Sequence, residues 1–147
     1  MADEFCVGGW LLTMAFIFYN PNPKGRFVGD CTIRAICKLT NQDWDTVYAA
    51  TTFQGFLAKD MPSGNATWGA YLHKIGYSRG FIPDDRLGRY TVKDFCRDHP
   101  SGGFLLVLDQ HVVTVEDGDY YDTWDSGNEF PVYYWTKGDH IANAQHI

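Results

Sequence analysis

Between residues 31 and 97, hydrophobic side chains recur at the spacing of helices. This periodicity predicts four helices, over residues 31–39, 43–52, 66–75 and 92–97. Asp30 and Thr91 stand at the N-cap positions of the first and the last helix, and Gly76 follows the third as a C-cap. Residues 56–65 and residues 77–89 are rich in turn formers, and both stretches are expected to be irregular.

From Gly103 onwards the spacing changes to that of strands. Strands are predicted over residues 104–108, 111–115, 120–124 and 130–136. The first is continuously apolar, which is typical of a strand buried on both faces, and Asp117-Gly118 predicts a hairpin turn between the second and the third. Helices followed by a meander of strands predict an α+β fold, with N-terminal helices packed on a C-terminal antiparallel sheet.

The 147 residues are expected to form a single domain, residues 1–147. Residues 5–19 are the most apolar run, and their later part is predicted to be a strand. Met14 is an alternative natural start, which would make residues 1–13 an extension that packs poorly. The polar residues 138–147, which include two histidines, are expected to form a frayed tail.

Charge and composition narrow the classes of function. The net charge of −6 argues against a protein that binds nucleic acid without regard to sequence, because such a protein needs a basic surface for the phosphates. Lys and Arg are also too scattered for a membrane-binding patch. Residues 5–19 are too short to cross a bilayer comfortably, and Asp3 and Glu4 stand where a secretion signal is basic. Neither a nucleic-acid nor a membrane partner is predicted.

The cysteines indicate a reduced protein of the cytoplasm. Cys6, Cys31, Cys37 and Cys96 include no C-x-x-C pair and no spacing typical of metal ligands. A secreted disulfide scaffold is therefore not expected, and neither a metal nor another cofactor is predicted. Cys37 and Cys96 are expected to be core residues.

Cys31 is the candidate for a reactive residue. At the start of a helix its thiol would face unpaired backbone N–H groups and the positive end of the helix dipole, and both favour the thiolate. The same N–H groups could stabilise an oxyanion. A carboxylate at Asp30 would oppose the thiolate if it lay close. The alternative interpretation is a small buried cysteine at the start of a core helix.

His111 is predicted to meet a carboxylate across the hairpin. If Asp117-Gly118 forms a two-residue turn, the register makes His111 and Asp122 diagonal neighbours on one face, about 7 Å apart at Cα. A carboxylate there would fix the tautomer of the imidazole and stabilise the imidazolium. A three-residue loop would bring Asp125 to that face instead. The two-residue turn is the better-populated geometry, which favours Asp122.

Cysteine, histidine and aspartate thus occur in that order, the first opening a helix and the other two on strands. In this the chain resembles the papain-like cysteine peptidase superfamily, through Gly29-Asp30-Cys31, His111-Val112-Val113 and Tyr121-Asp122-Thr123-Trp124. It is also similar to small phage and prophage proteins that share the Asn-Pro stretch before the cysteine and this hairpin. The resemblance covers residues 20–136.

That resemblance implies a fold, an activity and three roles. Cys31 would be the nucleophile, His111 the general base and acid, and Asp122 the orienting residue. The substrate would be a peptide or protein, cut at a peptide or isopeptide bond in the cytoplasm of a bacterial host cell. The oligomeric state does not follow from it.

One position departs from the superfamily pattern. A Gln about six residues before the cysteine usually supplies an oxyanion-hole amide, and here that position is Gly25. Asn20 or Asn22 would replace the amide if the proline-rich loop folds back. Without it only the Cys31 N–H remains, and losing one donor costs on the order of a hundredfold in rate. A second hypothesis therefore stands beside the hydrolase: a weak or inactive papain-like fold of phage origin that binds a host protein target as a counter-defence protein.

Overall fold

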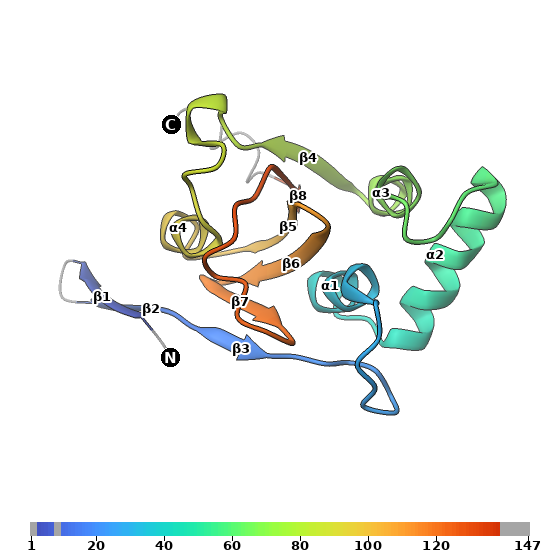
Figure 1. Cartoon of the computed structure of the whole chain (residues 1–147), viewed down its shortest axis with the longest axis horizontal. Helices are drawn as coiled ribbons and strands as arrows, with labels where there is room; N and C mark the ends of the chain where they lie inside the picture. The colour runs from blue at the N-terminus through green and yellow to red at the C-terminus, as the bar shows by residue number, and fades with distance from the viewer. Residues whose placement is uncertain (1–2, 8–9, 139–147) are drawn as a thin grey trace.

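The computed structural model describes the backbone of residues 3–7 and 10–138 and the side chains of residues 14–138, which form an α+β arrangement (Figure 1). The helices of this part of the chain are α1 Cys31–Thr40, α2 Trp44–Ala58, α3 Asn65–Lys74 and α4 Val92–Asp98, with a 3-10 turn at Asp84–Arg86. Its strands are β1 Asp3–Val7, β2 Trp10–Met14, β3 Phe16–Phe18, β4 Tyr77–Phe81, β5 Gly103–Leu108, β6 His111–Glu116, β7 Asp119–Asp122 and β8 Tyr133–Lys137. The predicted α+β class is confirmed.

Six of the strands form one sheet, in the order β3-β7-β6-β5-β8-β4. Neighbouring strands run antiparallel except at one edge, where β3 pairs parallel with β7, from Phe16 opposite Tyr120 to Phe18 opposite Asp122. The expectation of a purely antiparallel sheet is therefore wrong, because the N-terminal segment joins the sheet as an edge strand. The strand predicted in the later part of residues 5–19 is confirmed as β3.

Two segments are more regular than expected. Helix α2 continues to Ala58, although residues 56–65 were expected to be a loop. Residues 77–81, expected to be irregular, form the edge strand β4. For β4, the reason is a close contact with the neighbouring strand β8. A Cβ at Gly80 would lie 2.2 Å from the ring of Tyr134, so glycine, which is a poor strand former, is needed there for the close approach of the two strands.

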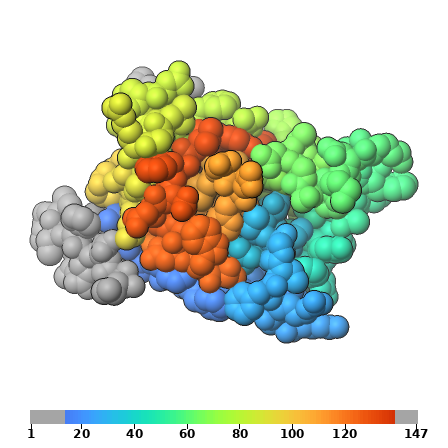
Figure 2. Space-filling view, viewed as in Figure 1, coloured from blue at the N-terminus to red at the C-terminus, as the bar shows by residue number. Residues whose placement is uncertain are grey.

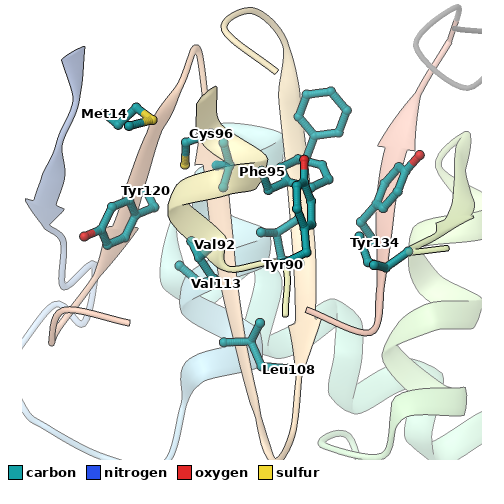
Figure 3. Packing of buried hydrophobic residues seen from close by; sticks show 13 residues of the cluster. Met14, Tyr90, Val92, Phe95, Cys96, Leu108, Val113, Tyr120 and Tyr134 are labelled. Atoms are coloured by element: carbon teal, nitrogen blue, oxygen red, sulfur yellow. The ribbon is translucent and has the colours of Figure 1, made fainter. Parts of the chain in front are cut away.

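Helices cover both faces of the sheet. Buried residues of α1 and α3 pack with Leu105 and Val107 of β5 on one face. On the other face α4 packs with Phe104 and Leu106, in a cluster rich in aromatic side chains (Figure 3). The alternation along β5 confirms the prediction of a strand buried on both sides. The sheet thus separates two cores.

Several helix ends agree with the sequence. Helix α1 begins at Cys31 as predicted, and Thr91 caps α4 in a capping box with Asp94. Among the described residues, no helix combines the length and the apolar character that crossing a membrane requires. The packing of residues 1–13 and nearly all of the predicted tail, with His140 and His146, lie outside the described side chains.

Candidate active site

Cys31 is the first residue of α1, and its side chain is half-buried. Asp30 stands at the N-cap position, but its side chain does not cap the helix. Asp30 Oδ1 instead accepts a hydrogen bond from Arg34 Nη1 at 2.7 Å, and Oδ2 accepts one from Trp44 Nε1 at 2.9 Å. The predicted cap is wrong because a charged donor and an indole hold the carboxylate. The first N–H groups of α1 are therefore left without a cap from Asp30.

His111 opens strand β6 and meets Asp122 at the end of β7. Its Nε2 lies 2.6 Å from Asp122 Oδ2. The strands pair in the register that a two-residue turn predicts, with Thr114 opposite Tyr121, so the expected contact is confirmed. Asp125, the alternative, accepts a hydrogen bond from the Tyr120 hydroxyl instead. The ring of Trp124 contacts the imidazole at a centroid distance of 4.8 Å.

Cys31 and His111 are electrostatically coupled. Burial of the thiol opposes ionisation, but hydrogen bonds from the His111 side chain and the Val112 N–H, with the charges of His111 and Arg34, lower the pKa of Cys31 below its usual value. Burial likewise disfavours the imidazolium, yet the contacts with Asp122 and Cys31 raise the pKa of His111 to about 9. With Nε2 engaged by Asp122, Nδ1 is the ring nitrogen left for the Cys31 sulfur. The two pKa shifts act in the directions that favour a Cys31 thiolate and a His111 imidazolium.

Asp122 is buried, and each of its oxygens accepts two hydrogen bonds. Oδ2 accepts from His111 and from the Ser126 hydroxyl at 2.8 Å, while Oδ1 accepts from Arg34 Nη2 at 3.1 Å and from the Thr123 N–H at 2.8 Å. Although burial favours the neutral acid, the bond and the charge of His111, together with the bonds from Ser126 and the Thr123 N–H, lower the pKa of Asp122. The carboxylate is therefore ionised and fixed in orientation.

Two of the partners of Asp122, Arg34 and Ser126, are not predicted from the sequence. Arg34 follows Asp30 by one helical turn, and this spacing is a signal for an ion pair that could have been used. Ser126 is fully buried, in the segment after β7. Nothing in its sequence neighbourhood distinguishes it from a turn residue.

A cavity of about 230 Å³ adjoins Cys31 and His111. Its wall includes the start of α1, the start of α3 with Asn65 and the preceding Ser63, and the β5–β6 turn with Gln110. These parts of the chain adjoin on the surface seen in Figure 2. Apart from the Cys31–His111 pair, its lining side chains carry no charge. The cavity therefore suits an uncharged polar group.

Two carboxamides give this cavity its hydrogen-bonding capacity. Asn65 Oδ1 accepts from Trp68 Nε1 at 3.2 Å, and because an indole N–H only donates, the amide nitrogen of Asn65 remains available as a donor. Gln110 is exposed in the turn directly before His111, with a left-handed φ of 55°. Neither residue is predicted from the sequence as part of the site; Asn65 reaches it only because the fold brings the start of α3 to the cavity that Cys31 and His111 line.

The residues proposed for the oxyanion hole lie in a loop bonded to itself. Asn20 Nδ2 donates to the Arg26 carbonyl at 3.2 Å, and Asn22 Oδ1 accepts from the Lys24 N–H at 2.9 Å. Neither asparagine is among the residues that line the cavity. Gly25 has a φ of 64°, the conformation that favours glycine. The role of Asn20 or Asn22 as a donor stays a prediction.

The other described cysteines differ from Cys31. Cys37 and Cys96 are buried, and burial, with nearby carboxylates, raises the pKa of each to about 12. The side chain of Cys6 lies outside the described residues. Within the described part of the chain, no group of three His, Cys, Asp or Glu side chains is placed to hold a metal ion.

Comparison with protein-family models, with curated proteins and with solved structures found no match to this chain.

Proposed function

We propose that this protein is a cysteine-dependent hydrolase that cleaves a peptide or isopeptide bond through Cys31, His111 and Asp122. The observation that carries the proposal is the meeting of Cys31 and His111 in the wall of one cavity, with His111 Nε2 2.6 Å from the ionised Asp122. A lowered thiol pKa beside a raised imidazole pKa is what a nucleophile and its general acid require at neutral pH.

The reaction follows from this arrangement. The Cys31 thiolate attacks the carbonyl carbon, a C–S bond forms, and negative charge moves to the carbonyl oxygen. His111 then gives its proton to the departing amine as the C–N bond breaks, which leaves a thioester on Cys31. Next, His111 accepts a proton from water, and the resulting hydroxide displaces the sulfur, so that the acid product leaves and the thiolate–imidazolium pair is restored. Asp122 holds the imidazole in place throughout.

In this proposal the cavity binds the acyl part of the substrate. The N–H groups at the start of α1 supply oxyanion donors, and the carboxamides of Asn65 and Gln110 supply hydrogen bonds that the missing Gln would otherwise give. Without a charged side chain beyond the Cys31–His111 pair, the wall selects an uncharged residue next to the scissile bond. We infer a peptide or protein substrate with a neutral polar side chain at that position.

A papain-like fold belongs to this proposal. It is supported by the cysteine at the start of a helix that packs on the sheet, and by His111 and Asp122 on adjacent antiparallel strands. We also infer action in the cytoplasm of a bacterial host cell. Cys31, Cys37 and Cys96 are all free thiols, which a reducing compartment maintains.

A second function is favoured by one observation, the position before the nucleophile. Gly25 has no side-chain amide, Asn20 Nδ2 donates to the Arg26 carbonyl, and Asn22 Oδ1 accepts from the Lys24 N–H. A weak or inactive enzyme with this arrangement would act by binding a host protein target instead. The two functions differ in whether Cys31 accepts an acyl group.

Acyl transfer from p-nitrophenyl acetate tests the proposal. The native protein should release p-nitrophenol in repeated turnovers and carry acetyl on Cys31, identified by peptide mass spectrometry. His111→Ala should lose both at neutral pH. An absence of acetyl-Cys31 in the native protein, or equal acetylation in the two proteins, would contradict the hydrolase and leave the binding function.

A further inference from the structure

A buried cation lies behind the Asp122 carboxylate. Arg34 is 5 % exposed and follows Cys31 by three residues on α1. Its guanidinium donates through Nη1 to Asp30 and through Nη2 to Asp122, so that it joins the two carboxylates. None of the acyl-transfer steps proposed above uses Arg34 directly.

The arginine is itself held from behind. Asp30 is 6 % exposed, and its second oxygen accepts from the Trp44 indole at 2.9 Å. Trp44 in turn stacks on Tyr48, at a centroid distance of 4.8 Å and an interplanar angle of 12°. We call Trp44, Asp30, Arg34 and Asp122 the Arg34 network. It runs from the start of α2, through α1, to the end of β7.

Charges alternate along the path from this network to the nucleophile. Asp30 is negative, Arg34 positive and Asp122 negative, and they are followed by the imidazolium and the thiolate. A buried ion pair is seldom the most stable way to fill a core, since apolar side chains of similar size serve as well or better. Asp30 has also given up the helix cap to join Arg34. The arrangement therefore calls for a role other than stability.

The geometry at Asp122 indicates that role. Arg34 and the Thr123 N–H occupy Oδ1, so Oδ2 is the oxygen left for His111 and Ser126. We propose that Arg34 is a positioning residue: clamped by Asp30 and, through it, by Trp44, it fixes the Asp122 carboxylate in the orientation that His111 requires. This inference rests on the proposed function. Helix α1 then carries both the nucleophile Cys31 and Arg34, which aligns the base His111 through Asp122.

The charge of Arg34 also acts on the nucleophile directly. It is one of the causes that lower the pKa of Cys31, after the contacts with His111 and the Val112 N–H. Removing Arg34 thus weakens the thiolate in two ways, through a less firmly held Asp122 and through a lost positive charge. Both effects move the pH dependence of Cys31 reactivity in the same direction, towards higher pH.

The test is the pH profile of Cys31 alkylation by iodoacetamide in a set of full-length variants. In Arg34→Met the midpoint should rise by on the order of one pH unit, with a roughly tenfold slower reaction at pH 7. Arg34→Lys keeps the charge but not the two-pronged contact, so its shift should be smaller. Trp44→Phe removes one hydrogen bond and keeps the ring, and it should shift the midpoint least.

Lys38→Met is the matched control, since it removes another cation of α1. Lys38 pairs with Glu116 at 2.8 Å and lies over the Tyr121 ring, away from the network. It should leave the midpoint unchanged. If Arg34→Met does not fold, Arg34→Lys and Trp44→Phe carry the test.

Two results would overturn the inference, and they are distinguishable. If folded Arg34 variants lose melting temperature but keep the native midpoint, Arg34 is structural and only this inference fails. If the native protein itself shows the profile of an ordinary thiol, the proposed function fails, and the positioning role fails with it.

Discussion

Helices α1 and α4 pack on opposite faces of strand β5, and the thiol of Cys31 on α1 differs in chemistry from that of Cys96 on α4. Cys96 on α4 lies in the aromatic cluster, where burial and the Asp119 carboxylate raise its pKa to about 12. Cys31 on α1 is half-buried, and burial opposes its ionisation too, but its pKa is lowered. Burial alone makes a thiol inert. The imidazole, the Val112 N–H and the nearby guanidinium reverse that effect at one end of α1.

The largest difference in activity should appear between two single variants, in which Cys31 or Cys96 is replaced by alanine. Cys31→Ala should abolish acyl transfer, a loss on the order of 10⁴-fold or more, because no other group can carry the acyl intermediate. Cys96→Ala should keep the activity and destabilise the fold by about 1 kcal/mol through a small cavity. Initial rates with p-nitrophenyl acetate and thermal melts measure both. Activity lost equally in the two variants would remove the distinction between the helices.

The next largest loss of activity should come from changing the carboxylate that contacts His111. Asp122→Asn should lower acyl transfer by on the order of 10²-fold or more, because the amide no longer stabilises the imidazolium. It should also lower the free energy of unfolding by roughly 3–5 kcal/mol, since Arg34 then lacks one buried partner.

Asp125→Asn is the control in the same segment. Asp125 bonds to Tyr120 rather than His111, and an amide oxygen can still accept that hydrogen bond. Its activity should match that of the native protein. If Asp125→Asn were the less active variant, the assignment of Asp122 would be wrong.

A smaller loss of acyl transfer is expected when the polar side chains in the wall of the cavity are replaced. Asn65→Ala and Gln110→Ala should each slow acyl transfer by roughly tenfold, because each removes one hydrogen bond to the bound acyl group. Neither should change the pH profile of Cys31 alkylation, since neither is among the causes of its pKa shift. A changed alkylation profile with unchanged acyl transfer would reverse these roles.

The smallest effect is on stability against pH. In the native protein folding lowers the pKa of Cys31 and raises that of His111, so the two groups change the free energy of unfolding in opposite directions as pH rises. The pair therefore gives the free energy of unfolding a smaller pH dependence than His111 would give alone. In Cys31→Ala, Asp122 still raises the pKa of His111 above its unfolded value of about 6.5.

Folded Cys31→Ala therefore holds a proton that the unfolded chain has lost. Its stability should fall as pH rises from about 6.5 through the folded pKa of His111, by up to about 1 kcal/mol per pH unit. Urea unfolding at several pH values measures this, and the double variant with His111→Gln should be flat. A flat profile in Cys31→Ala alone would show that Asp122 does not stabilise the imidazolium.

The sequence contained enough information for the central contact because that contact is local. The Asp117-Gly118 turn sets the register of β6 and β7, and the register brings His111 to Asp122 eleven residues away. The start of α1 was also found, although for an incorrect reason. The residue type suggested a cap at Asp30, whereas its side chain binds Arg34 and Trp44.

The elements that were missed depend on partners distant in the chain. Strand β4 contains Gly80, which local propensity counts against a strand and which the Tyr134 ring requires. The parallel pairing of β3 with β7 joins segments about a hundred residues apart, and no short pattern encodes it. Asn65 and Ser126 reach the site in the same way. Propensity describes neighbours in sequence, and these contacts are made by tertiary packing.

The most direct measurement is the rate of Cys31 alkylation by iodoacetamide against pH, followed by peptide mass spectrometry in the native protein and in His111→Ala. The native rate should reach its plateau well below the usual thiol pKa, while Cys96 stays unreactive. In His111→Ala the plateau should be lost, with a reaction about 30-fold slower at pH 7, because an ordinary thiol with a pKa near 8.5 is only about 3 % ionised there. Identical profiles in the two proteins would contradict the ion pair on which the proposed function depends.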